Sequence, residues 1–401
     1  MGNCPTEVLQ LNPMSKIFHI KFKLLVNSIF VLIFFGSTGC KKGCSDPTAL
    51  NYDSSVKRNE ASTCEYGSFN KQSLLLNLSD NFITPSLSLY KNSIDQLVTS
   101  TNDFNAEPTL INLEILKNSW KTSLLNWHGI CILGPSKFIT TDQIEYTNIY
   151  PIDTNTVIDN IINEFAPGNN DEEGFQALDY LLFSKTSQET INYFLNNSFA
   201  TQYLIQIVNN LSEICYSIEN KWNNEKQDFI NDYESVATGT SISIIVNSFN
   251  KHFEYYIRRG KFGLPLNVFD QFTQDVDPHL VECYFYGKSL PFAIKGIESL
   301  KKLINGYNFN TDENLTGFDD YLNFVGAQHS GINLSTKINN QIDHILTAIN
   351  GLNDPLSTEI QTNKTQVDNA YEKLQQLVPL LKVDLTSALG VLITYADNDG
   401  D

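Results

Sequence analysis

The sequence has 401 residues and a formal net charge of −18, from 27 Lys and Arg against 45 Asp and Glu. Its apolar fraction of 41% is normal for a chain that buries a core, so a globular protein is expected. Such an acidic chain excludes nucleic acid as a partner, because binding phosphates requires clustered Lys and Arg. The charge is compatible with binding cations and with solubility at a membrane surface.

The first 39 residues form a predicted secretory signal. Lys16, Lys21 and Lys23 precede an apolar run over residues 24–35, and small residues follow in Gly36-Ser-Thr-Gly-Cys40. This run is too short for a stable membrane helix. Its end resembles a bacterial lipoprotein cleavage box, which implies lipidation of Cys40. The membrane partner would then be reached through this anchor, and the location would be the cell envelope, at the outer membrane.

Residues 40–66 are predicted to form a small disulfide-stapled module. Cys44 and Cys64 lie 20 residues apart in an exported segment rich in turn residues, so a disulfide between them is expected. The segment resembles a short module of secreted proteins from Bacteroidetes-type bacteria. Two interpretations remain, a plain stapled linker, which is favoured, and a calcium site made by Asp46 and Asp53.

From Lys71 onward, apolar residues recur at helical spacing almost everywhere. A first long helix, with Pro85 expected to kink it, is marked by Leu75, Leu78, Phe82, Leu89, Ile94 and Leu97. A second helix, ending before Gly134-Pro135, is marked by Leu113, Leu116, Trp120, Leu124 and Trp127. Further helices are predicted over residues 157–165, 174–183 and 203–222.

A second set of predicted helices follows a polar stretch near residues 223–240. It covers residues 242–256, 292–304, 318–325, 334–349 and 365–381, and residues 391–395 could form an extended strand. Long helices with short connections indicate an all-α fold of two packed helical bundles. The predicted boundaries are 67–235 for the first bundle and 236–401 for the second.

The stretch Asp171-Glu-Glu-Gly174 opens the helix at 174–183. Acids ahead of a helix suit its positive N-terminal end. Gln176 and Asp179 lie three residues apart, so they share one face of that helix beside its apolar face. These patterns alone indicate a polar pair at the start of a buried helix.

The same stretch resembles the signature of the imelysin family of bacterial envelope proteins, Gly-x-His-x-x-Glu followed by an apolar helix. Gly174 matches, whereas Gln176 stands at the His position and Asp179 at the Glu position. Other similar segments are the Trp120–Trp127 helix before Gly134-Pro135, the loop around Arg258-Arg-Gly-Lys261, and Val281-Glu-Cys-Tyr-Phe-Tyr286. The resemblance covers residues from about 70 to the end.

The resemblance implies a binding site near the signature, in a family linked to iron uptake and to a suspected metallopeptidase activity. The ligand-binding residues it suggests are Gly174, Gln176, Asp179, Arg258 and Lys261. Candidate ligands for iron or another divalent cation are Asp179, Gln176 and Glu173. A peptidase needs three zinc ligands and an open position, and the sequence has no His-Glu-x-x-His while Gln is a poor transition-metal ligand.

Other polar residues have competing interpretations. The favoured interpretation of the basic residues Arg258, Arg259 and Lys261 is the end of a helix stopped by Gly260. The alternative is that they pair with Asp179, Glu173 or an anionic ligand. His279 and Glu282 could share a helix face with Asp277 as a metal site, but a helix start capped by Asp277 with Pro278 in its first turn is favoured.

Two further features could belong to a site. His128 could replace the missing imidazole, although packing is favoured for a lone His beside aromatic residues. Asp397, Asp399 and Asp401 alternate like the start of a calcium loop without its distal Glu, which favours a tail.

Three functional hypotheses follow. The first is an exported lipoprotein that binds a cation, with iron as one candidate, or a small ligand between two bundles. The second is a metallopeptidase-like enzyme with an altered site. The third is a structural or interaction lipoprotein that has lost the site.

Overall fold

The structure, a computed structural model, describes residues 41–47, 49–65, 67–270 and 275–396. The chain divides into two compact units, Met1–Phe69 and Asn70–Asp401. The predicted signal peptide and Cys40 lie outside the described residues. Within the described part of the chain, no helix combines the length and apolar character needed to cross a membrane.

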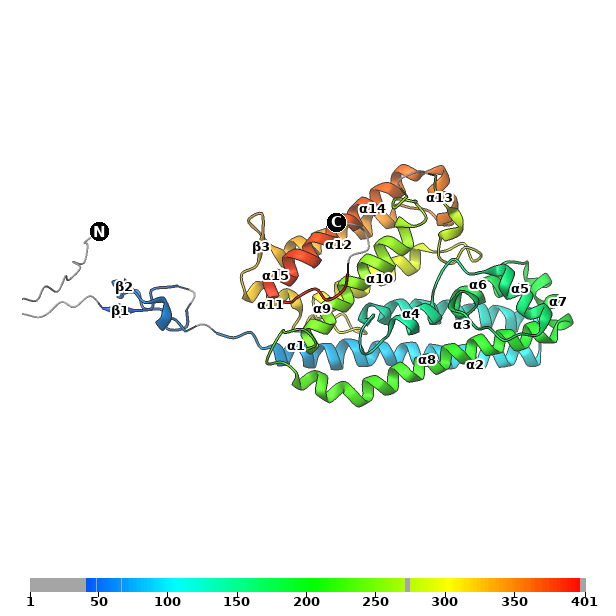
Figure 1. Ribbon diagram of the computed structural model, residues 1–401, viewed down its shortest axis with the longest axis horizontal. Coiled ribbons are helices and arrows are strands. Elements are labelled where there is room, and N and C mark those ends of the chain that lie inside the picture. The colour runs from blue at the N-terminus through cyan, green and yellow to red at the C-terminus, as the bar shows by residue number, and fades with distance from the viewer. Residues whose placement is uncertain (1–40, 48, 66, 271–274, 397–401) are drawn as a thin grey trace, which may run out of the picture. The chain divides into compact units, whose positions relative to one another are not determined.

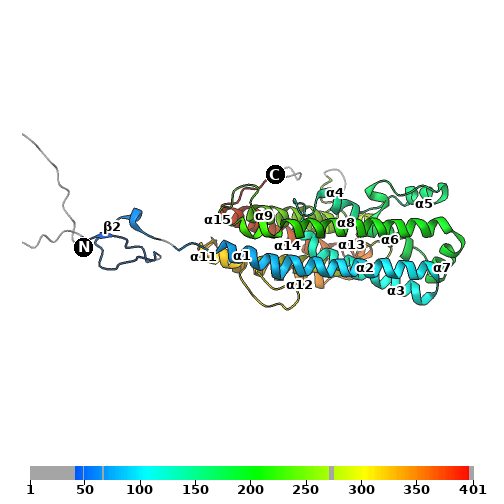
Figure 2. The ribbon, with the colours of Figure 1, turned by 90° about the horizontal axis from the view of Figure 1, so that it is seen from below.

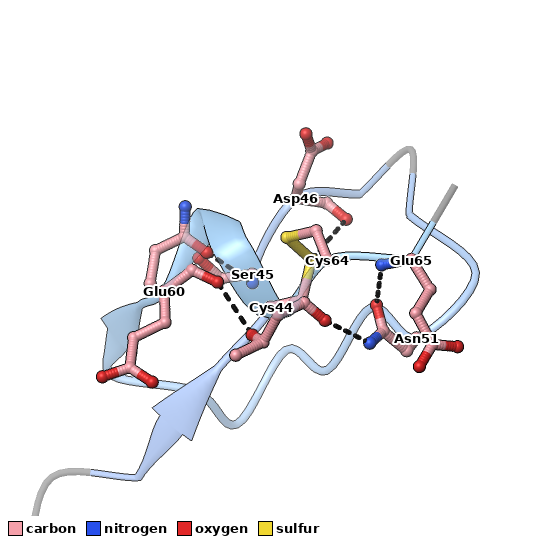
Figure 3. The surroundings of a disulfide bond; sticks show 9 residues. Cys44, Ser45, Asp46, Asn51, Glu60, Cys64 and Glu65 are labelled. Carbon is pink, nitrogen blue, oxygen red and sulfur yellow. Dashed lines mark hydrogen bonds between the residues drawn. A yellow bond between two sulfur atoms is a disulfide. The ribbon is translucent and has the colours of Figure 1, made fainter.

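The first unit is built around the predicted disulfide between Cys44 and Cys64, which is present (Figure 3). Strands β1 (Lys42–Gly43) and β2 (Arg58–Asn59) pair in parallel, and a short 3₁₀ helix, η1 (Ala61–Thr63), precedes Cys64. The Asn51 side chain closes the loop, because it donates to the Thr63 carbonyl and accepts from the Glu65 amide. The Asp53 carboxylate accepts hydrogen bonds from Lys41 and Ser55.

The second unit begins with a group of long helices that follow the predicted apolar positions. Helix α2 packs along both α3 and α8, and Figures 1 and 2 show these helices side by side. The elements of this group are α1 (Lys71–Asn77), η2 (Leu78–Ile83), α2 (Thr84–Ala106), α3 (Leu110–Ile130), η3 (Cys131–Leu133), α4 (Thr141–Thr147), α5 (Thr154–Asn163), η4 (Asn170–Glu172), α6 (Gly174–Phe183), α7 (Ser187–Asn196) and α8 (Ser198–Asn231).

A second group of helices completes this unit. Helix α10 contacts α3 of the first group and α12 of the second, so the two groups share a buried boundary. The elements are α9 (Ser241–His252), η5 (Phe253–Gly263), η6 (Pro278–Leu280), α10 (Leu290–Ile304), α11 (Phe318–Phe324), the hairpin β3 (Gln328–His329) and β4 (Ile332–Asn333), α12 (Leu334–Asn350), α13 (Leu356–Thr362), α14 (Lys364–Pro379), η7 (Leu380–Leu385) and α15 (Thr386–Leu389). The predicted all-α fold is confirmed.

Several local predictions need correction. Only the second part of the polar stretch near residues 223–240 connects the two groups, because α8 continues through its first part to Asn231. Pro85 lies in the first turn of α2, directly after the π-helical η2, whose wider turn accommodates a residue that cannot donate a backbone hydrogen bond. Gly260 does not stop a helix, since the π-helical η5 runs on to Gly263. The apolar pattern does not predict helices α4, α7, α13 and α15.

The chain's last described residues, 391–396, do not form a strand. They lie against α9 and η5, where the Asn247 side chain bonds the Leu392 carbonyl and the Thr394 amide. Tyr255 donates to the Ala396 carbonyl at 2.7 Å. Asp397, Asp399 and Asp401 lie outside the described residues.

Candidate functional site

Helix α6 begins at a position that only glycine fits well. Gly174 has φ +71°, in the left-handed region, and a Cβ added there would lie 2.5 Å from the carbonyl oxygen of Thr147. The signature glycine therefore lets the start of α6 press against the end of α4. This contact fixes where the next two turns of α6 point.

Gln176 and Asp179, on the buried face of α6, both bind the backbone of residues 281–286, which we call the strap. The Asp179 carboxylate accepts from the amides of Phe285 at 2.9 Å and Tyr286 at 2.8 Å. The Gln176 side-chain oxygen accepts from the Cys283 amide at 2.8 Å. Three strap amides that no helix or sheet satisfies are thus bonded by the signature residues.

The Gln176 side chain extends this contact into the interior. Its oxygen must face the Cys283 N–H, so its NH₂ group faces the side-chain oxygen of Asn148 at 2.8 Å. The NH₂ group of Asn148 then donates to the Glu282 carboxylate at 2.7 Å. Signature and strap are therefore joined by one hydrogen-bond network.

Glu282 is the centre of a buried charged cluster. Its carboxylate forms an ion pair with Lys261 of η5 and accepts from His128 Nε2 of α3 at 2.8 Å, and all three side chains are at most 4% exposed. Burial opposes ionisation of Glu282, but the charge of Lys261 and the hydrogen bonds from His128 and Lys261 outweigh it and hold the pKa of Glu282 well below its usual range. The cluster joins α3, η5 and the strap.

The two buried histidines of this region are neutral. Burial, with the Lys261 charge, lowers the pKa of His128, and burial, with His128 and Lys261, lowers that of His252 to about 3. Since a carboxylate can only accept, the proton of neutral His128 lies on Nε2. Cys131 lies 3.2 Å from His252 Nε2, and burial raises the pKa of its thiol, so it remains protonated.

Asp179 is a buried acid that differs from Glu282 in having no cation beside it. Its side chain is 1% exposed, and burial raises its pKa to about 7 against the effect of the two amide donors. Within the described ranges of the chain, no Lys, Arg or His forms an ion pair with it. The site therefore contains a carboxyl group poised between its two protonation states near neutral pH.

A pocket of about 230 Å³ opens beside the signature residues and the strap. It is lined by Tyr150, Pro151, Ile152, Thr154, Gln176, Asp179, His279, Val281, Tyr284 and Phe285. A smaller cavity of about 20 Å³, enough for one water molecule, lies among His128, Cys131, Asn148, His252 and Lys261. Tyr150 lines both spaces.

The structure does not bring all the predicted site residues together. Glu173 bonds Asn210 and lines another depression, with Asp142 and Glu213. Arg258 donates to Gln375 on α14 at 2.6 Å. Lys261 pairs with Glu282 rather than with Asp179 or Glu173.

Residues 277–282 follow the favoured interpretation of a capped helix start rather than the alternative of a His279–Glu282 metal site. Asp277 caps the short helix η6, with Pro278 in its first turn, as the favoured interpretation predicts. Glu282 lies outside this helix and points to Lys261, whereas His279 lines the pocket. His128 does not line that pocket, and its side chain is hydrogen-bonded to Glu282.

The residues present do not fit a metal ion held by protein ligands. No group of three His, Cys, Asp or Glu side chains placed to hold a metal occurs among the residues the structure describes. Gln176 and both oxygens of Asp179 already accept backbone hydrogen bonds. We therefore derive no chemistry through a resident metal.

A family model described as Imelysin (Peptidase_M75) matches residues 83–382, three quarters of the chain. This protein belongs to the imelysin family. The stretch that resembles the family signature is the strap-binding start of α6, which contains Gln176 and Asp179. A search of curated proteins finds no match.

Two solved structures share the imelysin fold of this chain. One, described as an iron-regulated protein A precursor from Parabacteroides distasonis, has a TM-score of 0.67 at 14% identity, covering 80% of this chain and 96% of its own. The other, an imelysin-like protein from Psychrobacter arcticum, has a TM-score of 0.62 at 13% identity, covering 81% of this chain and 97% of its own. At these identities the likeness concerns the fold.

Gly174→Ala is expected to destabilise the protein by at least about 2 kcal/mol, because alanine would be strained at this φ and would collide with Thr147. Gly168→Ala is the matched control, since its added Cβ meets nothing within 4 Å. Urea unfolding measures both variants. Equal stabilities would contradict the close contact between α6 and α4.

Lys261→Met is expected to cost about 3–5 kcal/mol, because it leaves the Glu282 charge buried without its cation. Adding Glu282→Gln to this variant should restore part of the loss. Lys226→Met, which breaks an exposed pair with Asp80, should cost less than about 1 kcal/mol. Urea unfolding that ranks the two Lys variants equally would refute the central role of the buried pair.

Proposed function

We propose that this protein is an exported, lipid-anchored member of the imelysin family that binds a small cation in the pocket beside Asp179. The single observation that carries the proposal is a buried carboxyl group without a cationic partner among the described residues, lining a pocket at the family signature. Burying a carboxylate is unfavourable unless a counter-charge compensates it. A bound cation would supply that charge.

The surroundings of the pocket support this proposal. The chain carries a net charge of −18, which attracts cations and repels anions over the whole surface. Lys261, which lines the neighbouring small cavity, is neutralised by Glu282. The hydrogen bonds from the strap to Gln176 and Asp179 hold the pocket wall in place, which lowers the entropic cost of binding.

Iron as the cation is supported by one structural neighbour described as iron-regulated, and not by the pocket itself, whose residues do not form a metal-ligand set. The peptidase hypothesis has less support, since it requires three zinc ligands and the described residues present no such group. A structural lipoprotein with a lost site is the remaining alternative.

Cation binding is tested by thermal unfolding of the purified protein with iron, zinc, calcium and a panel of organic cations. At a cation concentration 100 times its Kd, binding should stabilise the wild type by about 2.7 kcal/mol. The effect should be lost in Asp179→Ala and retained in Asp142→Ala, an acid of the other depression. If no cation stabilises the wild type in an Asp179-dependent way, the binding proposal fails and the structural alternative gains support.

The lipid anchor is tested by Cys40→Ser. This change removes the sulfur that would carry the lipid, so the protein should move from the membrane fraction to the soluble fraction on cell fractionation. Cys215→Ser, at a buried cysteine of α8, is the control and should stay in the membrane fraction. Membrane association of the Cys40→Ser protein would argue against anchoring at this residue.

A further inference from the structure

Aromatic and aliphatic side chains make up much of the pocket wall. Tyr150, Tyr284 and Phe285 line it together with the apolar Pro151, Ile152 and Val281. The Tyr284 ring packs against the Phe285 ring, with centroids 5.2 Å apart, and against that of His279 at 4.9 Å. Two of these aromatic residues belong to the strap, so the signature residues that bond the strap amides also hold the rings in place.

One acidic group lies in this aromatic surrounding. Each oxygen of Asp179 accepts a single hydrogen bond, from the amides of Phe285 and Tyr286. An ionised carboxylate has about four acceptor positions, so Asp179, which lines the pocket, keeps unused acceptor capacity. Both donors are neutral, and the negative charge of the ionised form is left for a ligand to balance.

The chemistry of the walls separates two classes of cation. A metal ion loses its water only where several oxygen, nitrogen or sulfur ligands replace it. Here the walls offer one carboxylate, an amide oxygen already bonded to Cys283, the hydroxyl groups of Thr154 and the two tyrosines, and the exposed His279, and the other lining side chains are aromatic or aliphatic. An organic cation needs a single counter-ion, and its weakly hydrated surface is attracted to aromatic faces.

We infer that the pocket binds a small organic cation, an alkylammonium or guanidinium compound, with Asp179 as its counter-ion and Tyr150, Tyr284 and Phe285 as its aromatic walls. The inference rests on the proposed function, because it names the class of cation that this pocket takes. A volume of about 230 Å³ lies below that of pockets for drug-sized ligands, so the ligand is small.

The probes are choline and methylguanidinium, with 3,3-dimethyl-1-butanol as the neutral control of the same shape as choline. Calorimetric titration of the purified full chain should show at least one of the two cations binding, and binding of the neutral analogue at least tenfold weaker. Equal binding of choline and its neutral analogue would overturn the inference, because it would indicate an apolar pocket without charge recognition.

Two pocket variants locate the binding. Asp179→Asn removes the charge, and Tyr284→Leu removes one ring while leaving the carboxyl group, so the second variant remains informative if the first does not fold. Each should weaken choline or methylguanidinium binding at least tenfold, whereas Glu213→Gln, outside the pocket, should leave it unchanged. Unchanged binding by folded Asp179→Asn or Tyr284→Leu protein would contradict the inference.

The outcomes distinguish this inference from the proposed function. If iron, zinc or calcium stabilises the protein through Asp179 while neither organic probe binds, the organic-cation inference is wrong and the cation-binding function stands. If neither metals nor organic probes bind, both fail.

Discussion

An ionised carboxylate buried between the two groups of helices is the constraint on which the rest of the site depends. Glu282 is 1% exposed, and its charge is tolerable only because Lys261 and His128 surround it and Asn148 donates to it. These partners come from η5, α3 and the end of α4. The buried charge can therefore be satisfied only when the two helix groups close around the strap, which makes the arrangement of the site a condition of folding.

The signature residues complete that arrangement from the other side. Gly174 sets the start of α6 against α4, and Gln176 and Asp179 then bond three amides of the strap. A neutral imidazole offers one hydrogen-bond donor and one acceptor. The Gln176 side chain does the same here, because its NH₂ group donates to Asn148 and its oxygen accepts from the Cys283 amide. Gln176 can thus serve the backbone where the family has His. The aromatic pocket wall is a consequence, because Tyr284 and Phe285 belong to the strap.

Helical periodicity predicted most of the fold, because long amphipathic helices bury apolar residues at regular spacing. It failed where tertiary context decides, as in the exposed continuation of α8 and the π-helical turn before Pro85. The site was harder to predict, since Lys261 and Glu282 are joined across the fold and no local pattern pairs them. One available signal was an acid within the apolar run Val281-Glu-Cys-Tyr-Phe-Tyr286, which indicates a buried charge in need of a partner. Gly174 was identified from the family signature, while its contact with Thr147 required coordinates.

The central claim is that the signature side chains hold the strap in place, and amide hydrogen exchange measures this directly. In the wild type, the amides of Cys283, Phe285 and Tyr286 should exchange slowly, because each is bonded to a buried side chain. Asp179→Ala should speed exchange at Phe285 and Tyr286, and Gln176→Ala at Cys283, while the amides of α2 stay protected. Unchanged protection of the strap in both variants would show that other contacts hold it, and would contradict the account.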